Sequence, residues 1–387
     1  MNTQSHIHLN LSPQRVPTRS RQNSGFTLVE IMVALTVSLI LMVGIMQLFV
    51  GNKQTSRLGS GVGEVQQAGN VAIELLAENM RMAGYVGCSK KAPLTVSAMN
   101  PPFAVGPEMT GSFIPAVAGF SVAAGAWAPA VPTNWGVGAI PINNSDVLQI
   151  NYGSAQNVPI AANMASSADN VVIPGNPDNA AVGDIFVIGD CGNIDIFRIS
   201  SVTTAGANTS LGHNATQNNS ATLSKAYTLT SNADLTFGQA SGVQAIRFSS
   251  STYFVRATNR LAADGSVIFA LYRQNTSGTN GGAAPPAEEL IEGVERMQVW
   301  YGQRQDINNI NYLPATAVTN WPQVISVRIA LLVSSRERVL DVQDNNTYAL
   351  LGQNVQRAGV AGAVITYPDD RRLRRVFSTS VSLRNRD

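Results

Sequence analysis

One long apolar run dominates the pattern of hydrophobic and polar positions along the chain. Between Phe26 and Gly51 the only charged residue is Glu30, so a helix over residues 26–50 presents an apolar surface on every side. Such a helix is long enough to cross a hydrocarbon core of about 30 Å. A carboxylate near the bilayer centre costs roughly 2.5 to 3.5 kcal/mol. The run therefore predicts a membrane-spanning helix whose single acid requires a compensating partner.

A helical stripe continues beyond the apolar run. Over residues 51–84, apolar residues recur at steps of three and four, and charged residues lie off that face. The stripe consists of Val65, Ala68, Ala72, Leu75, Leu76, Met80 and Ala83. We expect this amphipathic part of the helix to pack on a globular head and to end by Gly84 or Gly87. The glycines within 59–63 predict a hinge or a partly melted turn.

The remainder of the chain, residues 85–387, carries short β-type runs separated by turn residues. Strands are expected at 146–152, 184–188, 195–199, 243–248, 252–256, 267–273, 294–301, 324–333 and 376–383. Turn residues at 190–193 and 263–266 predict tight turns between neighbouring strands. One long helix followed by a series of strands predicts the α+β class, with an antiparallel β-sheet head packed on the helix.

Two stretches of the head lack a clear helix or strand pattern. Residues 89–144 contain eight prolines, which exclude long helices and central strands. Residues 200–234 are rich in Asn, Ser, Thr and Ala. Both stretches are expected to be large irregular loop insertions. Trp127 and Trp135 in the first insertion either pin it to the head, which we favour, or form a contact patch.

Charge and cysteine content narrow the possible functions. Charged residues make up 13% of the chain and the net charge is +2, so the broad basic field of nucleic-acid binders is missing. Residues 1–25 carry three arginines and no acid, which predicts a cytoplasmic N-terminus and an exported head. Cys88 and Cys191 then lie in an oxidising compartment. We expect a disulfide between them, closing a loop of roughly 100 residues and contributing about 4 to 5 kcal/mol.

The sequence offers no catalytic constellation. His213 is the only histidine outside residues 1–25, which excludes most Ser-His-Asp, Cys-His and histidine-rich zinc sites, and no phosphate-binding P-loop is present. We therefore expect neither an enzyme nor a cofactor. Asp184, Asp190 and Asp195 surround a predicted hairpin, and their carboxylates suit calcium. They lack the spacing of a calcium loop, so turn capping is favoured and no metal is predicted.

An arginine cluster lies near the C-terminus. Four of the five residues from Arg371 to Arg375 are arginines, and Asp369 and Asp370 precede them directly. The cluster either binds phosphate or another polyanion, or it forms a solvated turn that pairs with the two aspartates. We favour the solvated turn.

The start of the apolar run resembles a known processing signal. The segment Gly25-Phe26-Thr27-Leu28-Val29-Glu30 resembles the class III signal of type IV prepilins, in which Gly precedes the cut and Glu lies four residues after the new N-terminus. The resemblance implies that a prepilin peptidase cleaves between Gly25 and Phe26, removes the leader 1–25 and methylates the Phe26 amine. The amine of a neighbouring subunit would then neutralise Glu30. Alternatively, Glu30 lies at the headgroup boundary and needs no partner.

A second resemblance covers the strand-rich part of the chain. Residues 367–386, together with 84–88, 190–191, 292–302 and 327–333, are similar to the PilW family of type IV pilus minor pilins. The type II secretion pseudopilin GspJ is a related protein. The resemblance implies a pilin fold and a minor pilin that primes the fibre with other minor pilins and lies at or near its tip. It therefore also implies roles in twitching motility and cell adhesion.

The resemblance also implies partners and a location. The expected partners are the other minor pilins, the major pilin, the prepilin peptidase, the inner-membrane assembly platform and a large tip adhesin. The chain is expected first in the inner membrane, as a single-pass protein with a periplasmic head, and then in the pilus on the cell surface. Two alternative functions are a type II secretion pseudopilin and a tip module that binds carbohydrate or surfaces through its insertions.

Overall fold

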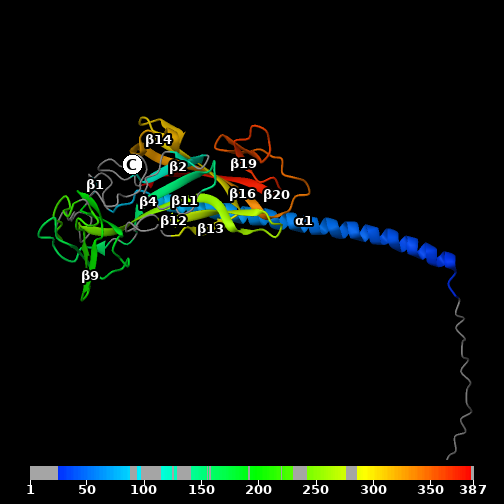
Figure 1. The fold of residues 1–387 in the computed structure, drawn as a ribbon, viewed down its shortest axis with the longest axis horizontal. Helices are drawn as coiled ribbons and strands as arrows, with labels where there is room; N and C mark the ends of the chain where they lie inside the picture. Colours follow the sequence, from blue (N-terminus) through cyan, green and yellow to red (C-terminus); the bar gives the residue numbers. More distant parts are fainter. Residues whose placement is uncertain are drawn as a thin grey trace, which may run out of the picture. The chain divides into compact units, whose positions relative to one another are not determined.

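The computed structural model describes residues 25–87, 94–96, 115–123, 126–128, 141–154, 156, 158–190, 192–218, 220–229, 242–275 and 286–384. The chain divides into two compact units, residues 1–56 and 57–387. Among these described residues, one long helix is followed by twenty strands that pair mostly antiparallel, which confirms the predicted α+β class. Figure 1 shows the helix and the sheets. Cys88, Cys191 and Trp135 lie outside the described residues, as does the side chain of Trp127, so the disulfide and the role of the tryptophans stay predictions.

Helix α1 (Leu28–Met82) begins at a capping box. The backbone N–H of Glu30 donates to Thr27 Oγ1 over 3.2 Å, and Glu30 Oε2 lies 3.5 Å from both the backbone N and Oγ1 of Thr27. The helix ends at Met82, two residues before Gly84, whose φ of +75° is the left-handed conformation that terminates helices. The predicted C-terminal boundary is therefore confirmed.

The predicted hinge is wrong, because α1 is helical throughout 59–63. Two glycines of α1, Gly61 and Gly69, serve close packing, whereas Gly59 and Gly63 contact no neighbouring element. A Cβ built on Gly61 would lie 3.0 Å from both methyl groups of Val339, and one built on Gly69 would overlap the ring of Phe377. The expected stripe is confirmed, since the buried residues of α1 are Gly61, Val65, Gly69, Ala72, Leu76, Ala77 and Met80.

The largest sheet is built around one long strand. Its path is β1 (Leu94–Val96), β8 (Ile194–Arg198), β7 (Ile185–Gly189), β11 (Gln244–Leu261), β4 (Asp146–Gly153), β2 (Val117–Ala123) and β3 (Ala126–Ala128), while β12 (Val267–Asn275), β13 (Glu288–Glu292) and β5 (Val158–Pro159) attach beside β11 or β12. Strand β11 joins the two runs expected at 243–248 and 252–256 into one element. The hairpin β7–β8 forms as predicted.

A four-stranded antiparallel sheet packs on the second half of α1. Its order is β15 (Ile310–Pro314), β14 (Val294–Arg304), β16 (Val324–Arg338) and β20 (Arg372–Ser382), and two short 3-10 helices, η2 (Ala315–Ala317) and η3 (Trp321–Gln323), follow β15. Val299, Ile329 and Val381 share one buried core with Leu76 and Met80 of the helix. On the opposite side, a small sheet of β17 (Tyr348–Leu350), β18 (Gln353–Arg357) and β19 (Ile365–Tyr367) covers Ala330 and Leu332 (Figure 1).

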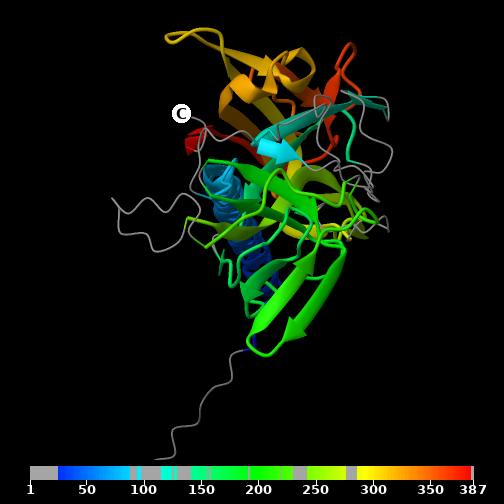
Figure 2. The same ribbon diagram turned by 90° about the vertical axis from the view of Figure 1, so that its left-hand side faces the viewer.

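Part of each predicted insertion is ordered sheet, which corrects the sequence interpretation. Strands β2 and β3 lie within 89–144, and no proline interrupts them, since Pro115 precedes β2 and Pro129 follows β3. Within 200–234, β9 (Ser201–Ala205) and β10 (Asn208–Gly212) form a hairpin that pairs with β6 (Val171–Pro174). This sheet lies at the margin of the head, away from the four-stranded sheet (Figure 2). The hairpin was missed because its residues are mostly Ser, Thr and Asn.

Candidate assembly interface

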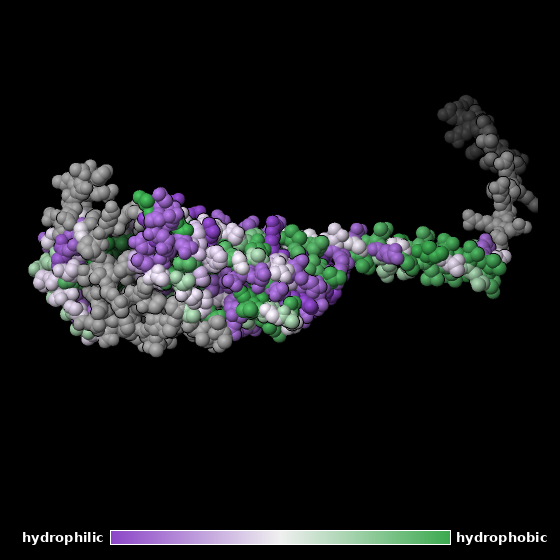
Figure 3. Space-filling view, turned by 90° about the horizontal axis from the view of Figure 1, so that it is seen from above, coloured by the Kyte–Doolittle hydropathy of each residue, from purple (hydrophilic) through white to green (hydrophobic). Residues whose placement is uncertain are grey.

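The helix surface from Phe26 to Val50 is apolar and uncovered. Every residue of this segment is exposed, and large hydrophobic side chains such as Phe26, Leu28 and Ile40 expose 79%, 75% and 72% of their surface. Figure 3 shows hydrophobic residues along this part of α1. An 18-residue window of α1 has the length and hydropathy of a membrane span, and none of it is buried. Contiguous apolar surface of this extent is stable only against lipid or other apolar helices.

Glu30 interrupts this surface at the N-terminal turn of the helix. Its carboxylate contacts only the backbone and hydroxyl of Thr27, both at 3.5 Å, and it makes no ion pair with any described residue. As the third helical residue it also lies beside the free N–H groups and the positive end of the helix dipole. These neutral donors satisfy the carboxylate in part and leave its charge uncompensated.

The predicted cleavage site lies directly before the helix. Residues Gly25 to Thr27 are exposed and non-helical, and a Cβ on Gly25 would meet no heavy atom within 4 Å. The bond between Gly25 and Phe26 therefore lies outside the hydrogen-bonded part of the helix, where a peptidase can reach it. The three predicted site residues, Gly25, Phe26 and Glu30, thus lie together at the start of α1.

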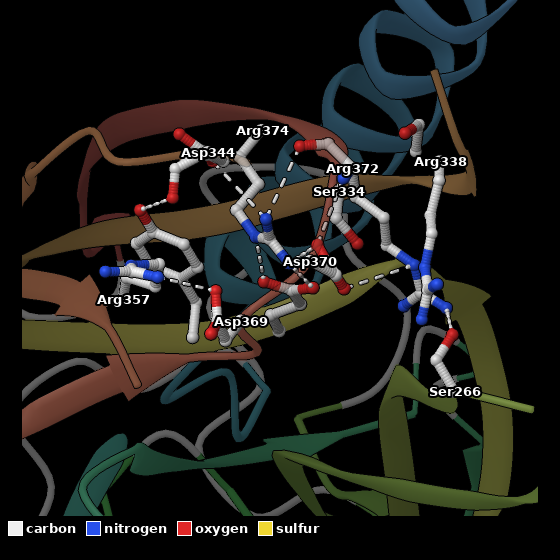
Figure 4. Close-up of polar contacts among 12 residues, drawn as sticks. Ser266, Ser334, Arg338, Asp344, Arg357, Asp369, Asp370, Arg372 and Arg374 are labelled. Atoms are coloured by element: carbon white, nitrogen blue, oxygen red, sulfur yellow. Dashed lines mark hydrogen bonds and ion pairs between the residues drawn. The ribbon is translucent and has the colours of Figure 1, made fainter. Parts of the chain in front are cut away.

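The C-terminal arginine cluster is buried instead of solvated, which corrects the expected turn. Arg374 has a fully buried side chain, and its Nε and Nη2 lie 2.7 and 3.0 Å from the two carboxylate oxygens of Glu295. Figure 4 shows Arg374 between Asp344 and Asp370. Its Nη2 also donates to Asp370 over 2.8 Å, and its Nη1 lies 3.3 Å from Asp344. Strand alternation explains the burial, since the side chains of Arg372 and Arg374 are buried while those of Arg371 and Arg375 are exposed.

The positive charge of Arg374 is compensated by the carboxylates of its own network. Burial alone would lower the pKa of Arg374, but the Glu295 and Asp370 carboxylates raise it above its ordinary value. Arg296, also buried, donates to the backbone oxygens of Glu295 and Thr366, and burial lowers its pKa to about 10. The carboxylates already occupy the guanidinium of Arg374, so this residue holds β20, β14 and the loop before β17 together instead of binding a polyanion.

The three aspartates near the β7–β8 hairpin are also committed to the protein. Asp184 accepts from Arg247 over 3.0 Å, Asp190 from Lys225 over 2.5 Å, and Asp195 from the hydroxyls of Ser224 and Tyr227 over 2.6 Å each. Asp190 also accepts from the backbone N–H groups of 192 and 193, so its predicted turn-capping role is confirmed. In the part of the chain that the structure describes, no group of three acidic, His or Cys side chains is arranged to hold a metal.

Comparisons with known protein families give two matches. The prokaryotic N-terminal methylation motif matches residues 20–46, which contain the predicted cleavage site and Glu30. The family of type IV pilus-assembly protein W matches residues 252–385, from the middle of β11 to the end of β20. Neither a comparison with curated proteins nor one with solved structures finds a match. The two family matches support a type IV pilin of the PilW kind, anchored in a membrane by its N-terminal helix, with a structural role in pilus assembly.

Proposed function

We propose that this chain, a type IV pilin of the PilW kind, is a minor pilin that primes the pilus fibre and lies at or near its tip. It enters the inner membrane as a single-pass precursor with its head in the periplasm. Prepilin peptidase removes residues 1–25 and methylates the amine of Phe26. The mature protein then joins other minor pilins at the assembly platform, ahead of the major pilin, and connects the fibre to a large tip adhesin.

The observation that carries this proposal is that Glu30, on an otherwise apolar helical segment from Phe26 to Val50, has no cationic partner among the described residues. Contacts between apolar helices replace contacts with lipid tails at little net gain, because both are equally apolar. The carboxylate makes the docking of two helices specific, since leaving it unpaired in the hydrocarbon costs roughly 2.5 to 3.5 kcal/mol. A cation supplied by the Phe26 amine of an adjacent helix offsets that cost and sets the axial register of the two helices.

Mass spectrometry of the N-terminus of the purified protein tests the processing step. We expect the mature chain to begin at Phe26, with one additional methyl group on its amine. A chain that still begins at Met1 in assembled pili would contradict the proposal.

The match over 252–385 is to a pilus-assembly family, which favours a pilus over the secretion alternative. A deletion strain separates the two. Loss of surface pili and twitching with normal protein secretion supports the minor pilin, whereas a secretion defect with normal pili supports the pseudopilin.

A further inference from the structure

The outward face of the four-stranded sheet is covered over only part of its length. Residues on β16 alternate, so that Val327 and Ile329 face the core shared with α1 while Arg328 and Ala330 face outward. Beneath the β17–β19 sheet, Ala330, Leu332 and Gln298 are buried. Beyond that cover, Arg328 is exposed, and Ser380, its partner on β20, is exposed as well.

Three side chains at the edge of this cover form what we call the aromatic platform: Trp300 and Tyr312, which are half-buried, and Arg328, which is exposed. Trp300 and Arg328 are direct cross-strand neighbours, and Arg328 Cζ lies 3.6 Å from the centre of the Tyr312 ring. The Ser326 hydroxyl donates to Tyr312 Oη over 3.0 Å. A Cβ on Gly302 would crowd both Ser326 and Tyr312, so glycine at this position allows the tyrosine ring to lie over β14.

The platform carries a positive charge. Arg296 and Arg374 lie on the same face of the sheet but are buried, with Arg296 bonded to backbone oxygens and Arg374 paired with carboxylates, whereas Arg328 is exposed. Arg328 makes no ion pair with any described residue, although stacking on Tyr312 fixes its guanidinium in place. A preorganised guanidinium binds a carboxylate with little loss of side-chain entropy.

The composition of the platform favours a protein partner. Trp, Tyr and Arg are the residues that dominate the binding energy of protein interfaces. A sugar would instead need an open aromatic face, and the guanidinium of Arg328 already covers one face of Tyr312. We infer that the aromatic platform docks a carboxylate-bearing segment of a different subunit of the same fibre. This inference rests on the proposed function and names one contact through which the head joins the assembly.

Site-specific photo-crosslinking of the full-length protein in pilus-forming cells tests the inference. A benzophenone amino acid replaces Ser380, which is exposed beside Arg328. We expect a crosslink to one other pilus subunit, with the modified peptide adjacent to an Asp or Glu. Arg328→Glu should reduce the crosslink by about tenfold or more, because it places like charges opposite each other. Arg371→Glu reverses an exposed charge outside the platform and should leave the yield unchanged.

Each outcome decides the inference. An unchanged crosslink in Arg328→Glu, a crosslink to a second copy of this chain, or an adduct to lipid would overturn it. Normal assembly of Arg328→Glu together with defective assembly of Glu30→Gln would reject the platform and retain the proposed minor pilin. Normal assembly of both variants would reject the platform and also the pairing of Glu30 with a neighbouring amine, whereas the proposed function itself fails if the deletion strain keeps its pili.

Discussion

Gly69 of α1 lies directly against the ring of Phe377 on β20. A Cβ built on Gly69 would overlap three atoms of that ring, although the two residues are far apart in the sequence. The absence of a side chain at position 69 therefore sets how closely the helix approaches the four-stranded sheet. Phe377 packs against the same core that contains Val65 and Ala72 on either side of Gly69 along the helix.

Gly69→Ala should destabilise the head despite the better helix propensity of alanine. Alanine gains about 1 kcal/mol over glycine within a helix, whereas overpacking costs typically about 1 to 3 kcal/mol. Gly63→Ala is the matched control, since a Cβ there meets nothing within 4 Å and should be neutral or stabilising. Thermal unfolding of the full chain in detergent, followed by circular dichroism, checks both. Equal melting temperatures for the two variants would contradict the packing role, and Phe377→Ala should relieve the defect of Gly69→Ala.

Periodic patterns made much of the fold predictable from the sequence. The stripe from Val65 to Ala83 identified the face of α1 that is buried, and runs of β-type residues between turn residues identified β4, β7, β8, β14, β16 and β20. The glycines of α1 were misread because a helical glycine signals either flexibility or close packing. Only the neighbour, such as Val339 opposite Gly61, distinguishes the two causes.

The candidate sites also differ in how far the sequence alone could predict them. Gly25, Phe26 and Glu30 form a local motif, so six consecutive residues contain the signal. The network of Arg374 draws on Asp344 and Glu295, which lie 30 and 79 positions away in the sequence, and no local pattern links them. Alternation along 371–375 was the available signal that two of the arginines point inward.

Removing one carboxylate from the buried network should destabilise the head strongly. Glu295→Ala leaves Arg374 buried without its bidentate partner, and breaking a buried pair in this way costs about 3 to 5 kcal/mol. Glu337→Ala, which removes an exposed carboxylate 3.6 Å from Arg57, should change stability by less than about 1 kcal/mol. Urea unfolding of the two variants measures the difference. A similar, small effect of both would indicate that Asp344 and Asp370 suffice to compensate Arg374.

Asp146 should make the stability of the head decrease between about pH 4 and pH 6. Burial raises its pKa from 3.8 to about 6, even though Ser121 and the backbone N–H of Val299 donate to its carboxylate. The folded state therefore binds a proton more tightly than the unfolded state. Its stabilising effect is complete below pH 4 and is lost as the pH rises through 6.

The change is on the order of 3 kcal/mol, from about 1.4 kcal/mol per pKa unit. Asp146→Asn removes the titrating group, so the difference in unfolding free energy between the wild type and this variant should vary over that pH range. The measurement is chemical denaturation at a series of pH values. A constant difference would show that Asp146 does not titrate in this range.

Gly25→Glu should block processing and leave the rest of the chain folded. Gly25 precedes the predicted scissile bond, and its exposed, open surroundings mean that the substitution perturbs no packing. We expect the variant to remain in the membrane as a precursor that migrates more slowly on a gel than the mature protein. Gly44→Ala, an exposed substitution within the apolar helix, is the control that should be processed normally. Wild-type mobility of Gly25→Glu would place the cleavage elsewhere.

Glu30→Gln separates two roles of the carboxylate that Glu30→Ala removes together. Glutamine retains the capping box with Thr27, worth about 1 kcal/mol at most, but it cannot form an ion pair with a neighbouring amine. Both variants should insert into the membrane as well as the wild type, because each loses a charge that is costly in hydrocarbon.

If pairing with the Phe26 amine drives docking, both variants should fail to assemble to a similar extent. If capping is the main role, Glu30→Gln should assemble normally and only Glu30→Ala should be defective. Counting surface pili by electron microscopy, with membrane fractionation as the control for insertion, distinguishes the two. Normal piliation in both would mean that the carboxylate finds no cation in the fibre, and the proposed docking mechanism would be wrong.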